Sequence, residues 1–365
     1  MVNQEQKKVY LLVGTHKGGF LFTSDKDRKN WQLQGPFFKG TDVHYMIFDT
    51  RKQPTIYACV NSSWWGPDIR FSQDFGKNWE EPKSGVRFEE GSDKKVNRVW
   101  CIEPGREHEP NVLYAGADPG SLFQSVDGGQ NWTEVKGLSN QPTRDRWFPG
   151  MGGLMVHSIC LHPEDTNKMH VGISAAGTFY TENGGQSWEA RNKGVLAEFL
   201  PEKYPDVGQC VHHMEMHPAK PEVLYQQNHC GVYRSDNAGK EWIDLCEGLP
   251  SRFGFPLQIH PHDPDTIYVI PEESPEFRCP VNAEFAVYRS RNRGENWQKL
   301  NTGLPNKNAY LNVYRHAMCA DSCDPCGIYL GTSTGQILYS RDEGESWEML
   351  SNWLAPIFSL NCAVF

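Results

Sequence analysis

The chain has 365 residues, two to three times the commonest domain length, so we expect two domains or one large repetitive domain. Hydrophobic residues make up 38% and charged residues 22%, which supplies a core and excludes a disordered chain. The formal net charge is −9 and no run of basic residues occurs, which excludes a general nucleic-acid binder.

The N-terminal segment does not have the pattern of a targeting signal. Residues 1–8 are polar, the apolar run at 9–13 is too short for a signal peptide, and no stretch reaches membrane-spanning length. The 11 cysteines are an odd number, which favours free thiols in a reducing compartment over a secreted disulfide framework. We therefore expect a cytoplasmic protein with no membrane partner.

Short β-strands are predicted along the whole chain. Residues 9–35 supply three strands, and the next unit begins near Val43. Later strands are predicted at 112–116 and 122–124, at 157–161, at 210–216, at 327–331 and 337–339, and at 357–365. With 34 glycines and 24 prolines, turns rather than long helices are expected between them.

Six of the 12 tryptophans end the same motif, Ser/Thr-x-Asp/Asn-x-Gly-x-x-Trp. The copies lie at residues 72–79, 125–132, 181–188, 235–242, 290–297 and 340–347, and a degenerate seventh at 24–31 has Lys26 and Arg28 at the acidic and glycine positions. We expect the polar side chains to bond a tight turn, the glycine to adopt positive φ, and the tryptophan to pack on the next strand. Seven units of four strands, 48 to 56 residues apart, predict a β-propeller.

These motifs resemble the Asp-box (BNR-repeat) propellers, which include sialidases, sortilin ectodomains, xyloglucan-degrading enzymes and a photosystem II assembly factor. The resemblance implies an all-β, seven-bladed propeller of four-stranded blades, one domain over residues 1–365, with residues 357–365 completing blade one. It implies no single function, because these relatives do unrelated things. The lack of an Arg-Ile-Pro motif argues against a sialidase, and one propeller does not supply the cleft that xyloglucan enzymes form between two.

The resemblance also implies a functional face at the start of the innermost strands, away from the boxes. Aligning the blades places His44, Arg98, His157, His212, Phe255 and Arg315 at equivalent positions, with His213 and His316 beside two of them. Imidazole is the commonest transition-metal ligand, so we predict one divalent metal (Zn, Mn or Fe). Its predicted ligands are His44, His157, His212 and His316. A metal-free pocket with a histidine base, or a structural role, are the alternatives.

The remaining candidates lie on the same face. The predicted catalytic groups are His213, His229 and Glu272. The predicted substrate contacts are Arg98, Arg315 and Lys17 for an anion, and Trp64 and Trp147 for stacking. Together they predict a metal-dependent enzyme that acts on a small polar, anionic or sugar-like substrate by hydrolysis, elimination or oxidation. The alternative function is a non-catalytic scaffold that binds a protein or glycan on the aromatic-rich face.

Three cysteines are close in the sequence near the end of the chain. The spacing of Cys319, Cys323 and Cys326 is compatible with zinc or an iron–sulfur cluster, but a fourth ligand such as Cys362 would have to come from elsewhere. We expect free, buried thiols here.

Overall fold

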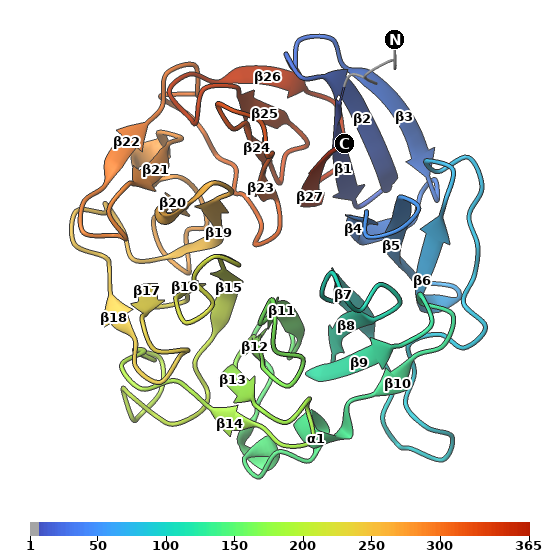
Figure 1. Cartoon of the computed structure of the whole chain (residues 1–365). Coiled ribbons are helices and arrows are strands. Elements are labelled where there is room, and N and C mark those ends of the chain that lie inside the picture. Colours follow the sequence, from blue (N-terminus) through green and yellow to red (C-terminus); the bar gives the residue numbers. More distant parts are fainter. Residues whose placement is uncertain (1–6) are drawn as a thin grey trace.

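Seven antiparallel sheets surround a central channel in the computed structural model, which describes residues 7–365 (Figure 1). Within this range, six sheets have four strands and the sheet of blade two has three. In blade two a single bridge joins Phe71 to Glu80, where the fourth strand lies in the other blades. The predicted seven-bladed, all-β propeller is therefore confirmed.

The blades follow one another around the ring in chain order. From the channel outward, blade one contains β27 (Ile357–Val364), β1 (Lys8–Thr15), β2 (Gly18–Asp25) and β3 (Gln32–Phe37). Blade two contains β4 (Asp42–Asp49), β5 (Thr55–Ser62) and β6 (Gly66–Ser72). Blade three contains β7 (Arg98–Pro104), β8 (Leu113–Asp118), β9 (Ser121–Ser125) and β10 (Thr133–Glu134). Blade four contains β11 (Val156–Leu161), β12 (Met169–Ile173), β13 (Gly177–Thr181) and β14 (Glu189–Ala190).

The second half of the ring repeats this arrangement. Blade five contains β15 (Val211–Met216), β16 (Leu224–Asn228), β17 (Gly231–Ser235) and β18 (Ile243–Asp244). Blade six contains β19 (Gly254–His260), β20 (Asp263–Pro271), β21 (Val287–Ser290) and β22 (Gln298–Leu300). Blade seven contains β23 (Met318–Ala320), β24 (Ile328–Gly331), β25 (Ile337–Ser340) and β26 (Glu348–Ser351). The helices of the described chain are α1 (Lys136–Ser139) and two 3₁₀ turns (Arg144–Arg146 and Val281–Ala283), each far shorter than a bilayer crossing requires.

The two ends of the chain close the ring, as predicted. Strand β27 pairs with β1 from Val9↔Val364 onward, and Lys8 and Phe365 exchange two backbone hydrogen bonds of 2.9 and 3.1 Å. Arg28, which replaces the box glycine of blade one at φ 55°, forms an ion pair of 3.1 Å with the buried Asp321 of blade seven. The arginine that replaces the box glycine in blade one therefore adds an ion pair between blades one and seven, where the ring closes.

The box motifs form the turns that their residue types predict. In blade three, Oγ of Ser125 accepts the Gly129 N–H at 2.9 Å, and Oδ1 of Asp127 accepts the Asn131 N–H at 2.9 Å. Gly129 has φ +88°, a conformation that costs a residue with a Cβ. The equivalent serine or threonine bond measures 2.7 to 3.0 Å in all six regular copies. These residues hold turns and are not free for chemistry.

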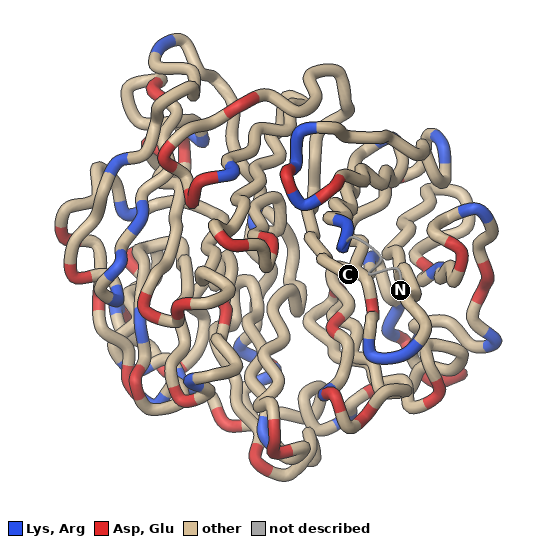
Figure 2. The backbone as a smooth tube through the Cα atoms, turned by 45° about the horizontal axis from the view of Figure 1, so that its top comes forward, with Lys and Arg blue, Asp and Glu red and all other residues tan. Residues whose placement is uncertain are grey.

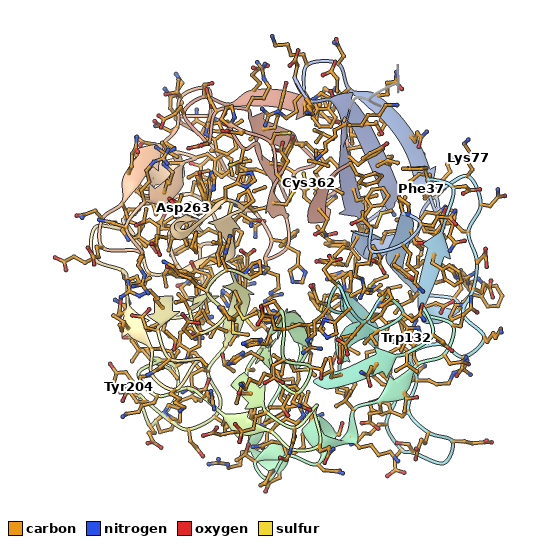
Figure 3. All side chains as sticks on the ribbon, in the orientation of Figure 1. Phe37, Lys77, Trp132, Tyr204, Asp263 and Cys362 are labelled. Atoms are coloured by element: carbon orange, nitrogen blue, oxygen red, sulfur yellow. The ribbon has the colours of Figure 1, made fainter. Side chains whose placement is uncertain are left out.

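The hydrophobic core lies between neighbouring blades. The box tryptophan Trp132 is buried, and its indole N–H donates to the Gly129 carbonyl at 3.0 Å (Figure 3). Basic and acidic residues are scattered over the molecule, with neither charge confined to one side of this view (Figure 2).

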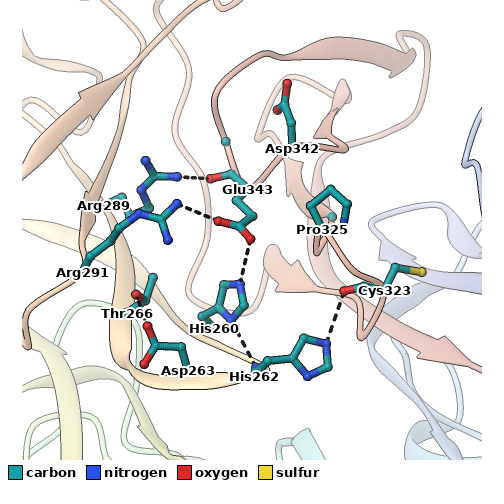
Figure 4. Close-up of polar contacts among 12 residues, drawn as sticks. His260, His262, Asp263, Thr266, Arg289, Arg291, Cys323, Pro325, Asp342 and Glu343 are labelled. Carbon is teal, nitrogen blue, oxygen red and sulfur yellow. Dashed lines mark hydrogen bonds and ion pairs between the residues drawn. The ribbon is translucent and has the colours of Figure 1, made fainter.

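Two histidines on the box side of blade six belong to contacts with blade seven. His260 lies 3.6 Å from Glu343, which also pairs with Arg291, and His262 contacts the Cys323 carbonyl at 3.2 Å (Figure 4). These side chains therefore join two blades.

Candidate functional site

A layer of flat side chains crosses the channel near the start of the innermost strands. The strand pairing shifts by one residue at the same place in successive blades, and each such β-bulge re-aims one side chain. We call the aromatic layer the bulged residues together with His316, which precedes β23 and bridges to Ser359 of β27: His44, Trp100, His157, His212, Phe255, Phe358 and His316. His44 is 4.1 Å from Trp100 and 4.8 Å from Phe358, measured between ring centroids.

Blade seven sends two side chains across the channel into this layer. His316 bonds the His157 carbonyl of blade four at 2.8 Å, and Arg315 Nε donates to the His212 carbonyl of blade five at 3.0 Å. The Arg315 guanidinium lies 5.4 Å from the Trp100 ring and 5.6 Å from the Phe255 ring. Burial lowers the pKa of Arg315 to about 10, and no carboxylate of the described chain forms an ion pair with it. Aromatic rings of blades three and six thus flank one arginine at this level of the channel.

The four predicted metal ligands lie in this layer, but the structure does not bring their ring nitrogens together. His157 Nε2 bonds the Val211 carbonyl at 2.8 Å, and His212 Nδ1 bonds the Gly254 carbonyl at 2.6 Å. His316 Nε2 bonds the His157 carbonyl. His44 is held by stacking. Burial is the main cause that lowers the pKa of all four well below the usual histidine value. Within residues 7–365, the one close group of three ligand atoms belongs to Cys210, His212 and His229.

The other predicted residues of this face are distributed around the layer. Arg98 stacks 5.6 Å from Trp100 and faces Asp118 in the strand pairing. Glu272 is buried, and burial raises its pKa to about 8, although Arg278 opposes the shift. His229 packs against Phe199 and Phe253.

The stacking and anchoring residues have two different environments. Trp64 is 87% exposed and Lys17 is also exposed, so both are available to a ligand. Trp147 is instead buried in the core of blade four, with its ring 4.6 Å from Phe179 and 4.7 Å from the Arg144 guanidinium. No pattern in the surrounding loop predicts that this side chain turns inward.

A cavity of about 430 Å³ lies on the other side of the aromatic layer and extends to the turns that follow the innermost strands. His213 lines it, with Nε2 3.1 Å from Oε1 of Glu215. The second oxygen of Glu215 accepts the Ile259 N–H at 2.7 Å and the Gln258 amide at 3.3 Å. His213 Nδ1 is buried and has no hydrogen-bond partner in the described structure. The Glu215 carboxylate therefore fixes the imidazole and leaves one ring nitrogen free.

Glu103 lines the same cavity from blade three. Burial raises its pKa to about 8; Arg51 lowers it and Glu215 raises it further. This carboxyl is neutral at pH 7 and can donate a proton, whereas an ordinary glutamate cannot.

Sequence reasoning found His213 but missed both glutamates. Glu103 and Glu215 each lie three residues after the bulged residue of their strand, Trp100 and His212. The side chains one and three residues beyond the bulge point to the same side, because a strand alternates with a period of two. Polar residues three positions after the bulged residue were therefore a usable signal for side chains that line the cavity. They are Glu103, Glu215, Gln258 and Asn361.

Cys319, Cys323 and Cys326 do not bring three ligand atoms within 4.8 Å of one another in the described part of the chain. The sulfur of Cys319 lies 3.4 Å from that of Cys362, which belongs to β27 and is labelled in Figure 3, and Cys326 is buried. All 11 cysteines are free thiols, as expected.

Comparison with known proteins gives distant relatives. No family model matches the chain. A Neosartorya fischeri protein named "probable oligoxyloglucan-reducing end-specific xyloglucanase" is 21% identical over 317 residues, and the match covers 81% of this chain. The chain spans 33% of that relative's length.

Two solved structures share the fold. An ancestral GH74 enzyme has a TM-score of 0.55 and 17% identity, covering 88% of this chain and 38% of that one. The structure titled "YCF48 bound to D1 peptide" has a TM-score of 0.53 and 14% identity. The match covers 93% of this chain and 97% of that one. These likenesses show the fold alone. The Asp-box family and its residues remain a resemblance.

Proposed function

We propose that this propeller is a hydrolase whose acid–base site is the channel cavity, with His213 as the general base and Glu103 as the general acid. The observation that supports it is the Glu215–His213 pair, which leaves His213 Nδ1 buried and unpartnered beside a cavity that Glu103 also lines. Glu215 is a positioning residue: it accepts the Nε2 proton and so leaves the lone pair on Nδ1.

The two groups suit opposite halves of one reaction. His213 Nδ1 takes a proton from the attacking water, and the neutral Glu103 carboxyl donates its proton to the leaving oxygen. A pKa near 8 keeps Glu103 protonated at neutral pH, which separates its role from that of Glu215.

The lining of the cavity favours a small, neutral, hydroxyl-bearing substrate such as a sugar. Gln258 and Asn361 add amides to the lining, and the volume suits a small molecule. Arg106 is the one arginine of the lining, and its guanidinium is bonded to Glu109 and to two carbonyls. Arg98 and Arg315, predicted to bind an anion, are not part of this lining.

The named activity of the fungal relative supports a glycosidic bond as the target, since that protein is a xyloglucanase by name. The present chain corresponds to a third of it, so the substrate is proposed from the cavity as well as from this likeness.

The test is hydrolysis of a panel of 4-nitrophenyl glycosides by the wild type and by Glu103→Gln and His213→Gln. Each substitution is expected to lower kcat by about 10²- to 10⁴-fold. Glu295→Gln changes an exposed glutamate outside the cavity lining, so it is the matched control and should keep full activity. In the wild type, kcat should fall as the pH rises through about 8, because Glu103 then loses its proton. Absence of this fall in Glu103→Gln would identify Glu103 as the acid. Wild-type inactivity on the panel, or full activity in both variants, would refute the proposal.

A second candidate is glycan or protein binding on the exposed aromatic loop between β5 and β6. Trp64 and Trp65 are 87% and 91% exposed, and their amides are held by Ser62 Oγ at 3.1 and 3.2 Å. Paired exposed rings are suited to stacking on sugars. A Trp64→Ala/Trp65→Ala variant should lose retention in a xyloglucan affinity gel while keeping its hydrolysis rate; unchanged retention would contradict this role.

A further inference from the structure

Three potential metal ligands meet where β15 begins and β16 ends. Cys210 directly precedes β15, His212 occupies its bulge, and His229 directly follows β16. One ligand atom from each residue lies within 4.8 Å of the other two. The His229 N–H donates to the Cys210 carbonyl at 2.9 Å, so the backbone itself ties the two ends together.

The surroundings orient both imidazoles. His212 Nδ1 is 2.6 Å from the Gly254 carbonyl oxygen, which requires a proton on Nδ1 and leaves the lone pair on Nε2. This is the arrangement by which metal-binding histidines are usually held, with the second ring nitrogen bonded to a carbonyl or carboxylate. The His212 ring stacks on Phe255 at 4.6 Å, and the His229 ring packs 5.2 Å from Phe253.

We propose that Cys210, His212 and His229 bind a zinc ion, with the fourth position open to water or a ligand. A thiolate with two imidazoles is a ligand set that favours zinc among the common divalent ions, and three protein ligands are typical of zinc sites that keep an open position. Bonds of about 2.0 to 2.3 Å bring tetrahedral ligands to about 3.5 Å from one another, so metal binding contracts the group by about 1 Å. His229, which is half-buried, supplies that movement.

An entry path reaches this site from the surface. A second cavity of about 490 Å³ is lined by His229, Phe199 and Phe253, and at its rim by Glu198 and Glu273. The two carboxylates favour the approach of a cation, and Arg252, the one arginine of this lining, is paired with Asp244. This cavity shares no lining residue with the channel cavity, so the zinc site is separate from the proposed acid–base site.

The test is titration of the chelator-treated, reduced full chain with Co²⁺, which reports thiolate ligation through a near-ultraviolet charge-transfer band. We expect one equivalent of Co²⁺, displaced by Zn²⁺, with the band abolished in Cys210→Ser. Cys323→Ser is the matched control for the other cysteine cluster and should keep the band. His229→Gln, a substitution at a half-buried position, should weaken Co²⁺ binding by about tenfold or more.

Glu103→Gln separates this proposal from the hydrolase, since it should bind Co²⁺ like the wild type whatever its activity. A charge-transfer band that survives in Cys210→Ser, or that is lost in Cys323→Ser, would overturn the zinc site. So would wild-type affinity in His229→Gln.

Discussion

Replacing Glu272 by glutamine is expected to change how the stability of the propeller depends on pH. The Glu272 side chain is 1% exposed, and burial raises its pKa to about 8 from an ordinary value of 4.5. The pKa of Glu272 is higher in the folded state than in the unfolded state, so protonation favours the folded state. This contribution to the free energy of unfolding is fully present below pH 4.5 and is lost as the pH rises to about 8. The difference between the two pKa values, about 3.5, corresponds to about 5 kcal/mol.

Urea denaturation of the wild type, Glu272→Gln and Glu273→Gln at several pH values between 5 and 9 measures this effect. Glutamine does not titrate, so the free energy of unfolding of Glu272→Gln minus that of the wild type should rise by about 4 kcal/mol from pH 5 to pH 9. Glu273 is exposed, and its variant should follow the wild type at every pH. Parallel profiles for Glu272→Gln and the wild type would show that this carboxyl is solvated and that the argument from burial is wrong.

Three further substitutions test the fold. Arg28→Ala leaves the buried Asp321 without its cation and should lower the free energy of unfolding by about 3–5 kcal/mol in urea; a loss below 1 kcal/mol would contradict the cross-blade link. Ser125→Ala removes the acceptor of the Gly129 N–H and should cost about 1–3 kcal/mol, seen as a lower Tm by calorimetry. Trp65→Ala should change stability by no more than about 0.5 kcal/mol, since the ring is 91% exposed, and a larger loss would mean that it packs in solution.

The sequence was sufficient for the ring because the box motif marks every blade and sets the spacing of the sheets. Aligning the blades also selected His44, His157 and His212, which the structure places at strand bulges, but in blade three it selected Arg98, whereas the bulged residue is Trp100. What the ring nitrogens bind was not predictable, because their partners are carbonyls of other blades, such as Val211 for His157. The raised pKa of Glu103 was not predictable, because it depends on burial by other blades, although the position of Glu103 three residues after the bulge was a usable sign of the side of the strand on which it lies.

The role of Glu215 likewise depends on contacts between blades that the sequence does not reveal. Its distance of two residues from His213 predicts only that both side chains share a face of β15. That this face borders a cavity, and that Gln258 of the next blade holds the carboxylate, follows from packing between blades.

The pairing of β1 with β27 has a consequence for how the protein folds. Val9 and Val364 are neighbours in one sheet although they are 355 positions apart in the sequence, so among the seven blades, blade one is begun before the others and completed after them. During synthesis, β1 presents an unpaired inner edge until the final strand has been made, and such edges are sites of mispairing between chains. The entropy of closing so long a loop grows only slowly with its length, so the delay affects the rate and fidelity of folding more than the final stability. Slow elongation or a shortage of chaperones should therefore increase the fraction of chains that associate through an open ring. The stability of the chains that do close the ring should not change.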